Sequence, residues 1–403
     1  MDKLDFNSRI KFIMKFGKAL HSVGSPAHTL EGIMQEICRG LNITGHIVSL
    51  PTAIFSSFSY EDQEVTRIER VEPMGINLGM LTQVDKVARD VIHQKMTLEE
   101  GSKKLDEILS HKNEMSKLAL VFFFVVCTSG FLVLFGGHWG DFLASLIVGL
   151  ILGFMSFIKP IGLVAQLYES FIAVIASLAT YLIAKFIPSL NVGVVILSSL
   201  IIFMPGLFIT IAIAEIATQN LTSGTSRLVG GAMILLKLTF GVFVGHKIAS
   251  WFHYPASSLS FENLPEWLLY VSLPVTAFMS AVTFKTSHQD LKWATLAGIF
   301  GFLCAKLGAH YLGAELGMFF GGACVGAMSN IFARVKDCPS SLFQFPGIIL
   351  LVPGSIGYRS LSFLFEKNLV SGLETAFTMI TLAMALVVGI FFGNILISPR
   401  KNF

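Results

Sequence analysis

Apolar residues dominate the chain from about residue 118 onward, in runs interrupted by short polar or glycine-containing segments. A helix needs about 20 mainly apolar residues to cross the ~30 Å hydrocarbon core of a bilayer. Several runs exceed that length and contain glycine or proline, which indicates tilted or broken helices. The runs lie near 118–135, 142–158, 163–187, 191–217, 228–250, 266–284, 291–308, 310–333, 342–365 and 373–397. The pattern predicts an α-helical polytopic membrane protein with ten transmembrane helices.

The residues before this region follow a different pattern, with apolar positions at helical or alternating spacing. Two helices are predicted at 7–22 and 26–40. Gly24, Ser25 and Pro26 separate them, with Ser25 placed as the N-cap of the second helix and Pro26 at its first position. From 47 to 60 the even positions are mostly apolar, which predicts a strand that turns around Glu61 and Asp62 into an antiparallel partner.

Helical spacing returns at 76–96 and again at 97–111, where Thr97 and Glu100 form a predicted capping box. The N-terminal part is therefore expected to be a small α+β unit. Within it, His28 and Glu31 share one helix face and could form an acid–base pair or half a metal site. No other ligand-type residue completes such a site, so a solvated or domain-facing surface is the favoured interpretation.

The frequency of charged residues falls at the same place, near residue 117. The first 117 residues hold 31 of the 55 acidic and basic side chains, although only 14% of all residues are charged and 53% are hydrophobic. The predicted domains are therefore 1–117, a cytosolic α+β unit, then 118–250 and 265–398, two membrane units. The N-terminus has no secretory signal pattern. A net charge of +3 without basic runs argues against nucleic-acid binding. Five scattered cysteines suggest neither a disulfide framework nor a metal site, and no cofactor is expected.

An internal repeat links the two membrane units. At an offset of 148 residues, Pro205 and Gly206 align with Pro353 and Gly354, and the match continues downstream without gaps. Each unit contains five predicted spans, an odd number, so the second must enter the membrane from the opposite side. The sequence thus predicts two inverted five-helix repeats, a recurrent plan among secondary transporters, with the substrate near the midplane.

Basic residues favour the side of the membrane on which both termini lie, which predicts cytosolic termini in a cell (inner) membrane. The same topology places the 219–227 loop in the cytosol and the segment 251–265 outside.

The two proline–glycine pairs lie inside the fourth and ninth predicted spans. Proline removes a backbone hydrogen bond and glycine loosens the helix, so each pair can expose a half-helix N-terminus that attracts carboxylates. A simple packing kink is the alternative. The candidate substrate-binding residues are Pro205, Gly206, Thr210, Pro353, Gly354 and Ser355.

Ionisable side chains inside apolar spans are costly and are functional candidates. Lys237 is expected to pair with Glu169 or Glu215. Glu215 is the first candidate for a proton carrier and Glu169 the second, because a buried carboxyl group can titrate near neutrality. Neutralising Lys237 is the alternative role for either acid. No catalytic motif is found, so an enzyme is not expected.

Several segments resemble the threonine/serine exporter family: HSVGSPAHTLE, TRIERV, NLGMLTQVDKVARDV and GSKKLDEI in the N-terminal unit, then LFGGHWGDFLAS, FMPGLFITIAIAEIATQNLTSGTSRLV and FPGIILLVPGSIGYRSL. The resemblance covers nearly the whole chain and implies export of threonine and serine driven by the membrane potential or a proton gradient. It also implies a role in proton coupling or charge pairing for the acidic residue Asp141. Methionine precedes Pro205, where leucine is commoner in that family.

Some relatives of this kind are split into two polypeptides and linked to dicarboxylate export, and that substrate class stays open as the alternative. The acids Glu169 and Glu215 favour an amino acid, whereas Lys237 and Lys306 favour a dicarboxylate. The expected partners are a small-molecule substrate, protons and the lipid bilayer. A homo-oligomer is left open.

Overall fold

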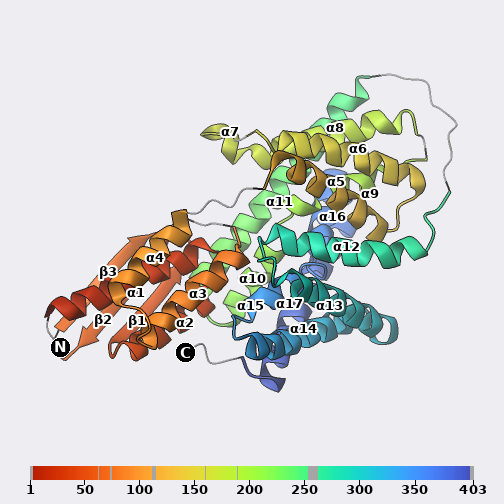
Figure 1. Ribbon diagram of the computed structural model, residues 1–403. Coiled ribbons are helices and arrows are strands. Elements are labelled where there is room, and N and C mark those ends of the chain that lie inside the picture. The colour runs from red at the N-terminus through yellow and green to blue at the C-terminus, as the bar shows by residue number, and fades with distance from the viewer. Residues whose placement is uncertain are drawn as a thin grey trace.

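The computed structural model describes residues 3–61, 63–72, 75–110, 115–158, 160–187, 189–252 and 262–399. The chain begins with an α+β unit that lies at one end of a bundle of longer helices (Figure 1). The elements of this N-terminal unit are α1 (Lys3–Ser22), α2 (Ala27–Gly40), β1 (Thr44–Leu50), β2 (Ala53–Tyr60), β3 (Gln63–Arg70), α3 (Leu78–Ile92) and α4 (Leu98–Ser110).

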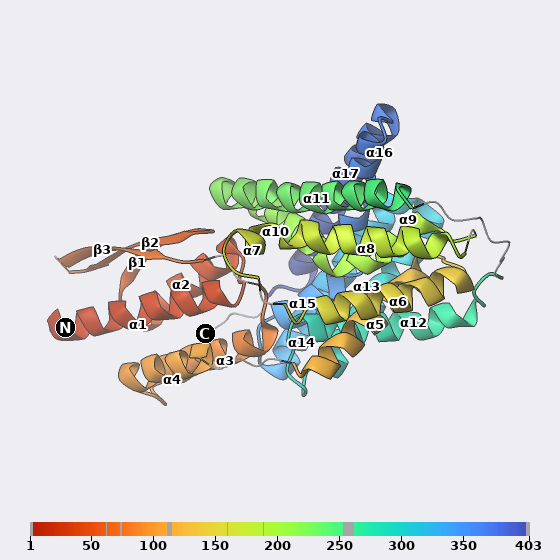
Figure 2. The ribbon, with the colours of Figure 1, turned by 90° about the horizontal axis from the view of Figure 1, so that it is seen from above.

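The three strands form an antiparallel sheet in the order β1-β2-β3. Helices α1 and α2 cover one face of the sheet, and α3 and α4 form a further layer behind them (Figure 2). The predicted capping box is confirmed, because the Thr97 hydroxyl accepts the Glu100 N–H at 3.2 Å and the Glu100 carboxylate accepts the Thr97 N–H at 2.9 Å.

The strand prediction was wrong in one respect. Residues 47–60 form two strands, because the chain turns at Pro51 and Thr52 between β1 and β2. The two-residue turn changes which positions face the core. Before it, the odd position Ile47 is buried and the even position Val48 is 55% exposed. The even positions face inward only from Ile54 onward. Asp62, in the predicted turn, lies outside the described residues.

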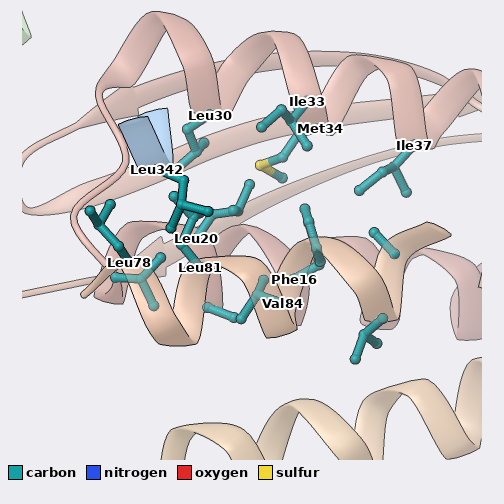
Figure 3. Close-up of a cluster of buried hydrophobic side chains, with 14 of the residues drawn as sticks. Phe16, Leu20, Leu30, Ile33, Met34, Ile37, Leu78, Leu81, Val84 and Leu342 are labelled. Carbon is teal, nitrogen blue, oxygen red and sulfur yellow. The ribbon is translucent and has the colours of Figure 1, made fainter. Parts of the chain in front are cut away.

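The core of the N-terminal unit continues into the helical bundle. Phe16, Leu20 and Leu30 are buried together with Leu342, which belongs to a helix of the bundle. Figure 3 shows Leu342 reaching among the side chains of α1, α2 and α3. The N-terminal unit is therefore packed against the bundle through a shared apolar core.

The helical bundle contains the elements α5 (Lys117–Leu134), α6 (Trp139–Met155), α7 (Leu163–Gln166), α8 (Tyr168–Ala184), α9 (Val192–Leu200), η1 (Ile201–Phe203), α10 (Gly206–Ala217), α11 (Leu221–Ser250), α12 (Trp267–Thr283), α13 (Leu291–Leu312), α14 (Ala314–Lys336), α15 (Ser341–Ile348), α16 (Gly354–Phe365) and α17 (Leu369–Leu396).

Each of the ten predicted apolar runs coincides with one of these helices or with two or three consecutive ones. Within the described residues, five helices are long and apolar enough to cross a membrane, or six if Val192–Phe203 and Gly206–Ala217, bent by 58°, make one span. The bundle also exposes many large apolar side chains, such as Leu118, Phe122 and Phe377. The chain is thus mostly helical and has the helices of a polytopic membrane protein, while the ten-span inverted topology stays a prediction.

Two details of the predicted topology differ from the structure. Helix α11 already begins at Leu221, so only residues 218–220 connect it to α10, in place of the predicted 219–227 loop. Most of the predicted outer segment 251–265 lies outside the described residues.

The offset of 148 residues reappears in the helix bounds. Helices α10 and α16 are both 12 residues long, and Gly206 and Gly354 begin them at equivalent positions. Helices α11 and α17 begin at the equivalent residues Leu221 and Leu369. A glycine in each of the helices α11 and α17 packs tightly on a neighbouring helix. Gly241 of α11 approaches the backbone of α8, and Gly389 of α17 approaches the backbone of α14. The sequence repeat is therefore a repeat of local structure.

Candidate functional site

The two proline–glycine pairs interrupt the helices in nearly identical conformations. Pro205 precedes α10 with φ −81° and ψ 34°, and Pro353 precedes α16 with φ −81° and ψ 32°. These values lie outside the helical range, so the preceding and following helices cannot continue into one another. Gly206 and Gly354 thus become the first residues of α10 and α16.

The two helix starts meet at their glycines. A Cβ atom added to Gly206 would lie 3.1 Å from the Cα of Gly354, and one added to Gly354 would lie 2.9 Å from the Cα of Gly206. Only glycine permits this approach without displacement of the backbone. Two helix N-termini, each with unsatisfied N–H groups and a partial positive charge, are thereby brought to one point, an arrangement that favours a bound anion.

A cavity of about 1060 Å³ lies beside this junction, and we call it the central cavity. Pro205, Gly206 and Gly354 contribute to its wall, and the N-terminal unit contributes Lys18 and Asn77. Most of the lining is apolar. The described lining residues include the bases Lys18, Arg227 and Lys285 and no Asp or Glu. This volume suits a small metabolite, since ligand pockets commonly measure about 300–1,000 Å³.

The other predicted substrate residues lie around the central cavity rather than on its wall. Pro353 and Ser355 belong to the second break but are not among the described lining residues. Thr210, one turn into α10, is buried and donates its hydroxyl hydrogen bond to the Gly206 carbonyl at 3.1 Å. It lines a separate, smaller cavity.

Lys237 contacts one of its two expected partners. Its Nζ lies 3.5 Å from Oε2 of Glu169 and donates to the carbonyl of Gln166 at 2.6 Å. Both charged side chains are about a quarter exposed and belong to the α8–α11 contact. Neither is a described lining residue of the central cavity.

Asp141 is fully buried at the start of α6. Its Oδ2 accepts the backbone N–H of His138 at 2.9 Å, and its Oδ1 accepts the N–H of Asn191 at 2.7 Å. The carboxylate therefore connects the beginnings of α6 and α9, away from the helix breaks. The His138 ring also approaches the carboxylate, with Nδ1 3.2 Å from Oδ2, so Asp141 caps the start of α6 and contacts its neighbouring histidine.

Glu215 holds the N-terminal unit to the bundle. The side chain is fully buried, and Arg227 donates to it from Nε at 3.0 Å and from Nη2 at 3.1 Å. The Ser223 hydroxyl donates at 3.2 Å and the backbone N–H of Ala27 donates at 2.9 Å. To take up a proton, this carboxylate would have to give up contacts that include a bidentate guanidinium.

The predicted cap of α2 was wrong, and Glu215 explains the difference. Helix α2 begins at Ala27, after Pro26, without a side-chain cap from Ser25. The Glu215 carboxylate accepts the first N–H of the helix instead. A negative charge at this end also complements the helix dipole. The docking of α2 therefore depends on a residue 188 positions further along the chain.

Two further contacts join the same parts of the molecule. The N–H groups of Leu78 and Gly79, at the start of α3, donate to the carbonyls of Phe284 and Lys285 at 2.9 and 3.1 Å. Arg89 of α3 binds the Asp337 carboxylate at 2.6 Å beyond the end of α14. The N-terminal unit is thus held at the ends of α10, α12 and α14.

His28 and Glu31 were both noted in the sequence. His28 lies where the N-terminal unit meets the bundle, and Glu31 contacts β1 of the N-terminal unit. Burial lowers the pKa of His28, with Arg227 acting in the same direction and Glu215 opposing it. Burial likewise lowers the pKa of His21. Glu31 accepts the Ser49 N–H at 2.7 Å, while burial raises its pKa. Among the described residues, no group of three His, Cys, Asp or Glu side chains could hold a metal ion.

Arg227 was missed by the sequence analysis, which assigned it to a cytosolic loop. It lines the central cavity, pairs with Glu215 and stacks over the Phe208 ring with its Cζ 5.1 Å from the ring centroid. The available signal was the spacing of Glu215 and Arg227 across a tight turn between two helices.

Two family models cover the chain. Residues 11–249 match a model described as "Putative threonine/serine exporter", and residues 269–396 match one described as "Threonine/Serine exporter, ThrE". No solved structure matches the chain.

Curated relatives come from yeasts and carry the name pheromone-regulated membrane protein 10. The Kluyveromyces lactis protein is 24% identical over 98% of this chain and 44% of its own length. The Candida albicans protein is 28% identical over 92% of this chain and 34% of its own length. For Eremothecium gossypii the identity is 24%, over 98% of this chain and 57% of the relative. The chain therefore spans about a third to just over half of these relatives.

Proposed function

Because the chain belongs to the threonine/serine exporter family, we propose that it exports small amino acids of the threonine and serine type across a cytoplasmic membrane. The membrane would be a cell (inner) membrane with both chain termini in the cytosol. In this proposal residues 1–117 form the cytosolic unit, and 118–250 and 265–398 form two inverted five-helix repeats.

The observation that supports this function best is the contact of Gly206 with Gly354 at the wall of the central cavity. The substrate carboxylate would bind in the central cavity beside the touching N-termini of α10 and α16, where partial positive charge is concentrated. Backbone groups freed at a helix break inside a membrane need a cavity or a protein partner, and transporters use such breaks to bind substrates. Thr210 supports the first break through its hydrogen bond to the Gly206 carbonyl, and Ser355 lies next to Gly354 at the second.

Proton coupling is part of the proposal, and the contacts help to choose between the two carriers. Glu215 accepts four hydrogen bonds, whereas Glu169 is partly exposed and has Lys237 at 3.5 Å as its partner. We therefore place Glu169 ahead of Glu215 as the proton carrier. The export of threonine driven by a pH gradient should be lost in Glu169→Gln, while exchange at equal pH survives.

One specific observation favours the second candidate, the export of dicarboxylates such as succinate. Lys18, Arg227 and Lys285 line the central cavity, and no acid is among its described lining residues. Two of these bases are already paired, however: Lys18 lies 2.6 Å from Glu69, and Arg227 binds Glu215. An amino acid, with a single carboxylate, therefore remains the better fit.

Sealed vesicles that contain the purified chain test the substrate directly. They are loaded with labelled threonine, serine or succinate, and efflux is followed with and without a pH gradient. The proposal predicts efflux of threonine and serine above that of protein-free vesicles, with succinate slower. Efflux of succinate alone would support the second candidate, and no efflux of any of the three would contradict export.

A further inference from the structure

The three bases that line the central cavity differ in their partners. Lys18 is paired with Glu69, and Arg227 is paired with Glu215. The side chain of Lys285 makes neither an ion pair nor a hydrogen bond to another described residue. Among the described bases of this wall, Lys285 therefore carries the positive charge that no acid compensates.

Lys285 lies just beyond the end of α12, beside the N-terminal unit. Helix α12 ends at Thr283, and Lys285 is exposed although it also lines the central cavity. It therefore lies where the cavity opens. A cation at such an opening attracts anions and can form a charge-assisted hydrogen bond with a carboxylate.

The start of α3 holds the backbone of this segment in place. The N–H groups of Leu78 and Gly79 donate to the carbonyls of Phe284 and Lys285 at 2.9 and 3.1 Å. The first N–H groups of a helix have no partner within that helix. These two bonds therefore satisfy the start of α3 and fix the chain that follows α12.

The contact at Gly79 leaves no room for a side chain. A Cβ atom added to Gly79 would lie 2.7 Å from the carbonyl oxygen of Lys285, so any other residue would displace that carbonyl. Lys285 itself has a φ of 51°, in the left-handed region that favours glycine. Its backbone conformation is unusual for a lysine and is held by the N-terminal unit.

We propose that Lys285 binds the carboxylate of the substrate as it enters the central cavity, and that the N-terminal unit positions Lys285 through Gly79. The inference rests on the proposed export function and deepens it. Lys285 would supply a full positive charge at the opening, ahead of the partial charges at the N-termini of α10 and α16. The N-terminal unit thereby contributes to substrate selection without taking part in the movement across the membrane.

Efflux of labelled threonine from sealed vesicles that contain the full chain tests the role of Lys285. Lys285→Gln removes the charge and should raise the half-saturating threonine concentration on the order of tenfold, as expected for one lost charge-assisted hydrogen bond, with little change in the maximum rate. Lys285→Arg keeps the charge and should retain most of the affinity. Lys86→Gln, at an exposed position of α3 outside the cavity wall, is the matched control.

Threoninol, in which a hydroxymethyl group replaces the carboxylate of threonine, tests which part of the substrate Lys285 contacts. Unlabelled threonine should inhibit efflux through the unaltered chain far better than threoninol does. In Lys285→Gln this preference should fall by the same factor as the affinity for threonine, because only threonine loses a partner. A lysine that merely stabilises the fold would weaken inhibition by both compounds alike.

Gly79→Ala tests the positioning by the N-terminal unit. The added methyl group displaces the Lys285 carbonyl, so the half-saturating concentration should rise. Gly32→Ala, whose Cβ would meet no atom within 4 Å, should leave it unchanged. In the Lys285→Gln chain, Gly79→Ala should have no further effect on affinity, because the charge that Gly79 positions is absent.

Equal half-saturating concentrations in Lys285→Gln and Lys86→Gln would overturn the inference, and so would an equal loss of inhibition by threonine and threoninol. Additive effects of Gly79→Ala and Lys285→Gln would overturn the role of the N-terminal unit. All these results leave threonine efflux itself intact, whereas the absence of efflux from the unaltered chain would contradict the transport proposal.

Discussion

The corner between α10 and α11 and the corner between α16 and α17 share one backbone but carry different side chains. The N–H of Asn220 donates to the Glu215 carbonyl at 2.8 Å, and that of Asn368 donates to the Phe363 carbonyl at 2.9 Å. Gln219 and Lys367, the residues directly before these two asparagines, have φ values of 65° and 63°. The two turns are therefore equivalent in conformation.

The side chains differ where the N-terminal unit docks. Glu215 and Arg227 in the first corner correspond to Phe363 and Thr375 in the second, at the same offset of 148 residues. The buried ion pair is thus not needed for the corner or for the helix break, which both repeats possess. It is present where α2 needs a cap, which indicates that Glu215 and Arg227 serve the attachment of the N-terminal unit.

The largest expected effect comes from breaking this pair on one side. Arg227→Leu leaves the Glu215 carboxylate buried without its guanidinium, and such a loss typically costs about 3–5 kcal/mol. Protease cleavage between the N-terminal unit and the bundle should become faster and the unfolding temperature should fall. Thr375→Val, the matched change in the second corner, should alter both measurements little.

The double variant Glu215→Leu/Arg227→Leu sharpens the comparison. Replacing a buried ion pair by apolar residues is often close to neutral, so the double variant should be more stable than Arg227→Leu. The unsatisfied N–H of Ala27 should still cost about 1–3 kcal/mol. If the stability loss of the double variant equals the sum of the losses of Glu215→Leu and Arg227→Leu, the two side chains do not act as a pair, and this would contradict the account.

A smaller effect is expected at the shared feature, the glycine contact. Gly354→Val would place a side chain against the Gly206 backbone, and such overpacking costs about 1–3 kcal/mol. Threonine efflux should be lost even where the protein is correctly inserted, because the two helix N-termini are forced apart. Gly32→Ala, at an exposed position with no atom within 4 Å of the added Cβ, is the control. Equal efflux in both variants would contradict the proposed site.

Docking of the N-terminal unit should also depend on pH. The pKa values of His21 and His28 are lowered by burial, so both are neutral in the docked state. Such a histidine binds a proton more readily in the undocked state than in the docked one. The docked state is therefore fully stable above the ordinary histidine pKa near 6.5, and it loses stability as the pH falls toward the lowered pKa. Cleavage should therefore accelerate below pH 6.5, and His28→Gln should reduce this dependence. A cleavage rate that does not change with pH in the unaltered chain would contradict this prediction.

The smallest effect is expected at the surface. Asp337 is 70% exposed at its side chain and binds Arg89 across the junction. Exposed ion pairs contribute at most about 1 kcal/mol, so Asp337→Asn should change the unfolding temperature only slightly. A loss as large as that of Arg227→Leu would show that the contacts at α3, rather than those at α2, dominate the attachment.

Local and repeated features could be predicted from the sequence, whereas contacts between distant segments could not. The helix breaks, the offset of 148 residues and the Thr97 capping box all follow from short-range chemistry. The Glu215 cap on Ala27 joins positions 188 residues apart and leaves no local pattern. Leu342 likewise reads as part of a membrane helix but packs into the N-terminal unit. The turn at Pro51 was hidden because apolar residues occupy even positions on both sides of it, Val48 and Leu50 before it and Ile54 and Phe58 after it.

Protection of a single cysteine tests the central claim, that the exported substrate binds where the two helix N-termini meet. Met204→Cys lines the central cavity beside the first break and can be placed in a chain without its native cysteines. At concentrations that saturate efflux, threonine should slow alkylation of this cysteine several-fold and should leave Leu221→Cys, at a 51% exposed position, unaffected. Equal alkylation of Met204→Cys with and without threonine would contradict the account.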